Sequence, residues 1–225
     1  MRDFLCDLFN LFQPLKEKVM KYNYLSFDIF DTLVIRKCGS PHNVFRLVED
    51  RFNSTHIENI SDFYNKRIHA EIMARETVAK AEITLDDIYE KLNAMYGENV
   101  ANELKKLEIE TEYEQCTARK EIVSIFNDVV ENKDVVIASD MYLPFDIVEG
   151  ILQINKIKIP KLILVSSECQ VTKSAGTMFT LIPQKFNCKP QDILHIGDNW
   201  GSDFLRPRLM GINSYILKKS KYEKL

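Results

Sequence analysis

Apolar and polar residues along the chain predict one short strand, then a series of helices, and then alternating strands and helices. The apolar, aromatic-rich run before Asp28 contains no Gly or Pro, which is typical of a buried strand. Four segments with apolar residues at helical spacing follow, and they predict helices at about 40–52, 61–78, 84–96 and 100–116. The later pattern predicts helices at 120–132, 144–154, 175–186 and 202–210, alternating with strands at 134–138, 162–165, 193–196 and 214–217.

Repeated strand–helix units predict a parallel sheet that is covered by helices on both faces. This α/β core comprises residues 22–36 and 119–225. Residues 37–118 interrupt the core and form a helical insert in which no strand is expected. We therefore predict a doubly wound parallel sheet with an inserted, all-helical domain.

Residues 1–21 have apolar positions at near-helical spacing, interrupted by Asp3 and Asp7. No small-residue cleavage site follows, and the apolar run is too short to span a bilayer, so neither a signal peptide nor a transmembrane segment is expected. The favoured interpretation is an amphipathic helix packed on the domain. The alternative is a helix that docks on a partner protein or a membrane surface.

Composition narrows the class of protein. Of the 225 residues, 45% are hydrophobic, which is enough for a packed core. The net charge is −3, and both signs are spread along the chain, so nucleic acid is not an expected partner. The five cysteines are widely spaced, odd in number and without a CxxC pair, which indicates a reducing compartment and a cytoplasmic location.

Polar residues cluster where the predicted strands end. Asp28 and Asp31 follow the first strand, Ser139 ends the second, and Lys173 comes shortly after the third. The fourth leads into Gly197-Asp198-Asn199-Trp200-Gly201-Ser202-Asp203. The carboxyl ends of parallel strands share one sheet edge, so we expect these side chains to meet in one cleft.

Carboxylates gathered at one edge repel one another unless a cation joins them. Mg²⁺ binds oxygen ligands and is often held by one or two carboxylates together with a substrate phosphate. One aspartate can then attack phosphorus, while a hydroxyl and a lysine hold the transferring oxygens. The set therefore predicts phosphoryl transfer to a carboxylate.

These motifs resemble those of the haloacid dehalogenase (HAD) superfamily: Phe27-Asp28-x-x-x-Thr32-Leu33, a strand ending in Ser139, then Lys173, then Gly197-Asp198-x-x-x-x-Asp203. The resemblance spans the core and implies a Rossmann-type sheet with a cap inserted after the first motif, where residues 37–118 lie. Residues 26–33 and 139–144 also resemble, more loosely, a bacterial subgroup of predicted hydrolases that is associated with surface polysaccharide synthesis.

The resemblance also implies roles for individual residues. Asp28 corresponds to the nucleophile, and Ser139 and Lys173 to the groups that hold the phosphoryl oxygens. The implied magnesium site comprises Asp28, the backbone carbonyl of Phe30, Asp198 and Asp203.

One position departs from the pattern of the phosphatases in this superfamily. They usually carry an acid–base Asp two residues after the nucleophile, and this chain has Phe30 there. General acid–base catalysis contributes roughly 10²–10⁴-fold, so its loss favours a substrate with a good leaving group. Asp31 has two interpretations: a turn residue that caps local N–H groups, or a substitute proton donor.

Three arginines are candidate ligands for the anionic substrate. Arg36 follows the first strand, and Arg67 and Arg75 share a predicted helix face with Glu71. The alternative for the helical pair is a solvated ladder of ion pairs. His195 lies inside the fourth strand and is expected to be a packed core residue.

The predicted function is a magnesium-dependent HAD-type hydrolase or phosphatase that acts on a small phosphorylated metabolite, with a sugar phosphate favoured, through an aspartyl-phosphate. One alternative is a docking or phospholigand-binding module that retained the metal site but lost turnover. Another is a carbon–halogen hydrolase, since dehalogenases of the superfamily also carry an aromatic residue at position 30; the intact 197–203 motif disfavours it.

Overall fold

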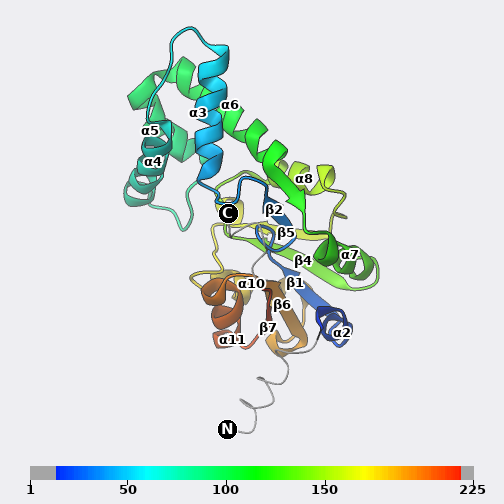
Figure 1. The fold of residues 1–225 in the computed structure, drawn as a ribbon. Helices are drawn as coiled ribbons and strands as arrows, with labels where there is room; N and C mark the ends of the chain where they lie inside the picture. The colour runs from blue at the N-terminus through cyan, green and yellow to red at the C-terminus, as the bar shows by residue number, and fades with distance from the viewer. Residues whose placement is uncertain (1–13, 219–225) are drawn as a thin grey trace.

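The computed structural model describes residues 14–218, which are built around a five-stranded parallel sheet (Figure 1). The strand order is β5-β4-β1-β6-β7, so the first strand of the chain lies in the middle. The strands are β1 (Tyr24–Phe27), β4 (Asp134–Ser139), β5 (Leu162–Val165), β6 (Ile193–Gly197) and β7 (Asn213–Ile216). Each neighbouring pair is parallel, so all five strands end at the same edge.

Helices cover both faces of the sheet, as the sequence predicted. On one face lie α2 (Leu15–Met20), α7 (Lys120–Val129) and α8 (Phe145–Ile154), and on the other lie α10 (Thr177–Phe186) and α11 (Arg206–Leu209) (Figure 1). The short helices α9 (Ser166–Cys169) and η1 (Pro190–Asp192) connect elements of the core. The predicted doubly wound α/β fold is therefore confirmed.

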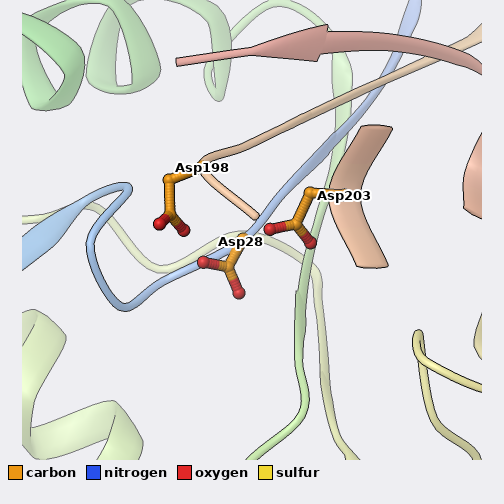
Figure 2. Close-up of side chains that lie close together, drawn as sticks. All are labelled: Asp28, Asp198 and Asp203. Carbon is orange, nitrogen blue, oxygen red and sulfur yellow. The ribbon is translucent and has the colours of Figure 1, made fainter. Parts of the chain in front are cut away.

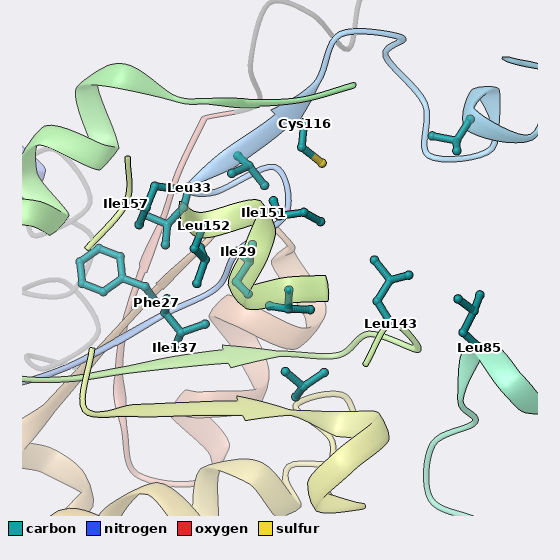
Figure 3. Close-up of a cluster of buried hydrophobic side chains, with 14 of the residues drawn as sticks. Phe27, Ile29, Leu33, Leu85, Cys116, Ile137, Leu143, Ile151, Leu152 and Ile157 are labelled. Carbon is teal, nitrogen blue, oxygen red and sulfur yellow. The ribbon is translucent and has the colours of Figure 1, made fainter. Parts of the chain in front are cut away.

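The larger hydrophobic cluster fills the face covered by α7 and α8 and continues into the helical insert of residues 37–118 (Figure 3). Phe27 of β1 meets Phe126 of α7 edge to face, with ring centroids 5.1 Å apart, and both side chains are fully buried. Burial of one such side chain stabilises the fold by roughly 1.5–3 kcal/mol. Because side chains alternate along a strand, Ser26 and its register partner His195 in β6 point to the opposite face.

Four helices form the cap, which Figure 1 shows beyond one end of the sheet. They are α3 (Asn43–Thr55), α4 (Phe63–Thr77), α5 (Leu85–Tyr96) and α6 (Glu98–Gln115). Two antiparallel strands connect the cap to the core, β2 (Val34–Arg36) and β3 (Cys116–Ala118). The expectation of no strand in residues 37–118 was therefore wrong, because β3 lies within that range.

The single helix expected at 202–210 is replaced by a π-helical turn followed by a short α-helix. Residues Trp200–Leu205 form a π-helical turn, η2, and α11 continues from it. The side chain of Asn199 accepts hydrogen bonds from the backbone N–H groups of Gly201 and Ser202 and so begins this turn. A π-helical turn inside a helix is rare and often lies at a functional site.

The expected helix over residues 1–21 falls partly outside the described residues, and its described part is α2, which begins directly after Pro14. Among residues 14–218, no helix has both the length and the apolar character needed to cross a bilayer.

Candidate active site

Asp28 lies at the centre of the sheet edge because it directly follows β1. Its backbone N–H donates to the carbonyl of Ile196 at 2.9 Å, which extends the pairing between β1 and β6 by one residue. The residue is 6% exposed. A buried carboxylate is costly unless it is paired or bound to a metal, so its partners matter.

The ammonium group of Lys173 is the partner of two carboxylates. Its Nζ lies 2.6 Å from Asp28 Oδ1 and 2.6 Å from Asp203 Oδ1. The loop that carries Lys173 is held by Asp140, whose carboxylate accepts from the backbone N–H groups of Lys173 at 2.6 Å and Ser174 at 3.0 Å. The sequence analysis missed this role of Asp140, although an Asp directly after a strand-ending Ser is a visible signal.

Asp203 comes from the π-helical turn and is held by three kinds of donor. Besides Lys173, the ring Nε2 of His195 lies 3.1 Å from Asp203 Oδ1, and the backbone N–H of Asn199 donates to Oδ2 at 3.0 Å. Asp198, at the end of β6, is partly exposed. Ser139 ends β4 and is buried.

Burial and the neighbouring charges shift the ionisation of these groups. Burial raises the pKa of Asp28 to about 7, since desolvation and the carboxylates of Asp203 and Asp198 outweigh the attraction of Lys173. Burial also acts against the ionised form of Asp203, but Lys173 and His195 hold its pKa well below the usual range. Desolvation lowers the pKa of His195, which favours the neutral imidazole.

The donor set fits a magnesium ion. The carboxylates of Asp28, Asp198 and Asp203 point toward one another (Figure 2), and one ligand oxygen from each lies within 4.8 Å of the others. Hard oxygen ligands of this kind suit Mg²⁺. A divalent cation at these oxygens would also favour the ionised form of Asp28, against the effect of its burial.

The backbone turns sharply shortly after Asp28. Asp31 adopts a left-handed conformation with φ of 59°, and its N–H donates to the carbonyl of Val34 at 2.7 Å. The ring of Phe30 lies under the guanidinium of Arg36, 4.4 Å from ring centroid to Cζ. Arg36 in turn makes hydrogen bonds to both carboxylate oxygens of Glu112 in α6.

The three candidate arginines are all engaged by carboxylates. The predicted ladder of ion pairs is present, because Glu71 pairs with both Arg67 and Arg75. Arg67 is 0% exposed, however, so this end of the ladder is buried and not solvated. Its Nε and Nη2 each lie 2.8 Å from a Glu108 oxygen. Arg75 is half-exposed and bonds to Glu71 and Glu82. The structure therefore places Arg67 in the interior of the cap and Arg36 where cap and core join.

Comparison with known proteins identifies the fold class of this chain. No protein-family model and no curated protein matches the sequence. Solved structures do match: YfnB of Bacillus subtilis, assigned as a HAD hydrolase and bound to magnesium, is 16% identical with a TM-score of 0.62, over 88% of this chain and 95% of that chain. The chain thus has the HAD-like fold, an α/β Rossmann-type core with a helical cap.

Two further structures show the range of chemistry found on this fold. The defluorinating L-2-haloacid dehalogenase Rha0230 is 12% identical with a TM-score of 0.65, covering 89% of this chain and 83% of its own. The HAD family enzyme BT-2542 of Bacteroides thetaiotaomicron, in complex with magnesium and inorganic phosphate, is 14% identical with a TM-score of 0.61, covering 89% and 96%. At these identities the likeness shows the fold alone.

Proposed function

We propose that this protein is a magnesium-dependent hydrolase of HAD type that removes phosphate from a small phosphorylated metabolite. The observation that carries the proposal is the convergence of Asp28, Asp198, Asp203 and Lys173 at one sheet edge. A buried nucleophilic carboxylate, an ammonium group and a set of oxygen ligands are what phosphoryl transfer requires.

In the proposed reaction, a carboxylate oxygen of Asp28 attacks phosphorus and the bond from phosphorus to the leaving oxygen breaks. The leaving group departs with its electron pair and takes up a proton. Water then attacks the aspartyl-phosphate, which releases inorganic phosphate and restores Asp28. Lys173 and Ser139 hold the phosphoryl oxygens through charge and hydrogen bonding.

Mg²⁺, held by Asp28, Asp198, Asp203 and the backbone carbonyl of Phe30, would supply positive charge to the transferring phosphoryl group. Phe30 cannot donate a proton, so the proposal favours substrates whose leaving group is stable as an anion; Asp31 is the nearest carboxyl group along the chain that could replace the missing acid. A sugar phosphate remains the favoured substrate class; because a sugar alkoxide is a poor leaving group, this substrate would need Asp31 or another group to protonate the leaving oxygen.

A carbon–halogen hydrolase is the second candidate. It is supported by the aromatic residue at position 30 and by the fold shared with L-2-haloacid dehalogenases. In that reaction Asp28 would displace halide from carbon, and water would then hydrolyse the ester without a metal.

The test is release of phosphate by the purified protein from sugar phosphates, nucleotides and acyl phosphates, with Mg²⁺ or with a chelator. Asp28→Asn should lose at least about 10³-fold in turnover, since the nucleophile itself is removed. Asp146→Asn, the same chemical change in the first turn of α8, is the matched control and should keep wild-type activity.

Each alternative has its own result in the same assay. Halide release from 2-haloacids that is insensitive to chelator would support the second candidate. A folded protein that binds Mg²⁺ but releases neither phosphate nor halide would overturn both enzymatic proposals and favour a binding module.

A further inference from the structure

A hydrogen-bonded network of buried polar side chains lies next to the proposed catalytic centre. Ser26 Oγ lies 2.8 Å from His195 Nδ1, and His195 Nε2 lies 3.1 Å from Asp203 Oδ1. That same carboxylate oxygen meets Lys173 Nζ, which also meets Asp28. The network thus begins at Ser26 in the central strand β1 and ends at Asp28, which directly follows that strand.

Packing alone does not explain a histidine at this place. His195 is 0% exposed, and the ring of Phe179 packs against it edge to face at 4.9 Å. The surrounding α10 face of the sheet is mainly apolar, including Ile193 and Ile182, although the buried Ser214 of β7 also pairs in register with His195. A buried imidazole needs partners for both nitrogens, and here both have them.

The partners determine which nitrogen carries the hydrogen. An ionised carboxylate only accepts hydrogen bonds, so the one between Asp203 and Nε2 requires hydrogen on Nε2. The neutral ring then offers a lone pair at Nδ1, to which the Ser26 hydroxyl donates. Ser26 and His195 are direct register partners on β1 and β6, so the sheet itself sets this contact.

We propose that His195 and Ser26 are positioning residues, which fix the Asp203 carboxylate and, through it, the ammonium of Lys173 against Asp28. Asp203 Oδ1 receives donors from two directions, and the backbone of Asn199 holds Oδ2. Without the Nε2 donor the carboxylate loses one of these restraints and can rotate. The proposal rests on the proposed function for its catalytic meaning, and its geometry can be tested without any substrate.

The first measurement is the tautomer of His195 in the wild-type protein. Histidine-labelled protein would be studied by long-range ¹H–¹⁵N NMR at neutral pH, and the His195→Gln spectrum would identify the signal among four histidines. We expect hydrogen on Nε2 and an acceptor at Nδ1. Hydrogen on Nδ1, or rapid exchange between the two tautomers, would overturn the proposal whether or not the protein is an enzyme.

The second measurement is Mg²⁺ affinity by calorimetry, with the metal alone as the ligand. His195→Gln can place an amide N–H near the position of Nε2, whereas His195→Asn cannot reach it. We expect His195→Asn to bind Mg²⁺ about 10–100-fold more weakly and His195→Gln to recover most of that loss. Ser26→Ala should lower Mg²⁺ affinity less, because it removes the partner of His195 Nδ1 but keeps the Nε2–H donor to Asp203.

A control variant separates positioning from general destabilisation. Thr111→Val removes a buried hydroxyl of the cap that donates to the carbonyl of Leu107, and it should leave Mg²⁺ affinity unchanged. Equal affinities of His195→Asn and His195→Gln would contradict the proposal. If the wild type bound no Mg²⁺, the proposed metal-dependent function would fail, and the tautomer would still decide the positioning role.

Discussion

Gly197 lies against the Asp203 side chain so closely that no other residue fits. A Cβ at this position would come within 2.6 Å of Asp203 Oδ2, a distance that real side chains do not adopt. The glycine is therefore required by the close approach of the carboxylate and not by backbone conformation. Its place in the Gly-Asp motif follows from packing against Asp203 at the proposed metal site.

Gly197→Ala should displace the Asp203 carboxylate and weaken Mg²⁺ binding by at least about tenfold, because it disturbs a ligand of the proposed metal site. Overpacking should also cost roughly 1–3 kcal/mol of stability. Calorimetric titration with Mg²⁺ and urea unfolding measure the two effects. Gly201→Ala is the control in the same motif, where an added Cβ would lie 3.3 Å from Asn199 Oδ1. It should change Mg²⁺ affinity and stability less than Gly197→Ala does, and a larger effect of Gly201→Ala would contradict this explanation.

Individual contacts were the part that the sequence could not predict. Asp28 and Asp198 directly follow β1 and β6, so the parallel topology brings them to one edge, as expected. Lys173 and Asp203 lie further along the chain and reach the same place through the loop held by Asp140 and through the π-helical turn. The sequence around His195 does not reveal a partner in Ser26, which is 169 positions away. Arg67 likewise faces Glu108, 41 positions along the chain, while helical spacing pointed only to Glu71.

Helix boundaries in the cap follow from local signals that the sequence does carry. Thr84 begins α5 with a capping box, in which its side chain accepts from the backbone of Asp87 and the Asp87 carboxylate accepts from the backbone of Thr84. Gly97, with φ of 80°, separates α5 from α6. By contrast, β2 and β3 have three residues each and show no alternating pattern long enough to identify them.

The capping box predicts a pH-dependent contribution to stability. Although partial burial opposes it, hydrogen bonds from Thr84 and the ammonium of Lys80 hold the pKa of Asp87 below its usual value. Its contribution is therefore present above about pH 4 and is lost as the pH falls through the folded-state pKa.

Asp87→Asn tests this directly. The variant keeps an acceptor oxygen but loses the negative charge that faces Lys80 and the helix N-terminus, so it should be less stable than wild type by roughly 0.3–1 kcal/mol at pH 7, and the difference should shrink toward pH 3. Urea unfolding at several pH values measures it. Asp86→Asn, whose side chain is mostly exposed, is the neighbouring control, and a pH-independent difference for Asp87→Asn would argue against the capping role.

At the scale of the whole molecule, the cap contacts the core at a second place besides the two connecting strands. Gln170 follows α9 and reaches the loop before α5: its Oε1 accepts from Ala81 N–H at 3.1 Å, and its Nε2 donates to the Glu82 carbonyl at 3.0 Å. Nearby, Leu85 N–H donates to the Tyr142 carbonyl at 2.9 Å. These bonds hold the cap over the sheet edge.

Gln170→Ala should loosen this contact without unfolding either part. Loss of hydrogen bonds worth about 1–2 kcal/mol should speed amide exchange at Ala81 and Glu82 by roughly 5–30-fold. Hydrogen–deuterium exchange resolved by residue measures this, with the amides of α6 as an internal reference. Unchanged exchange at 81–82 would show that Gln170 does not hold the cap in place.

The central place of β1 has a consequence for the synthesis of the protein. Tyr24 pairs with Asp134 on one side and with Ile193 on the other, so the strand that carries Asp28 leaves the ribosome long before either neighbour exists. The cap helices lie between these strands in the sequence and pack mainly on one another, so they can form while the nascent chain is still growing. The carboxylates of Asp28, Asp198 and Asp203, in contrast, can meet only after residue 203 has emerged, and the candidate active site is therefore among the last parts of the molecule to be assembled.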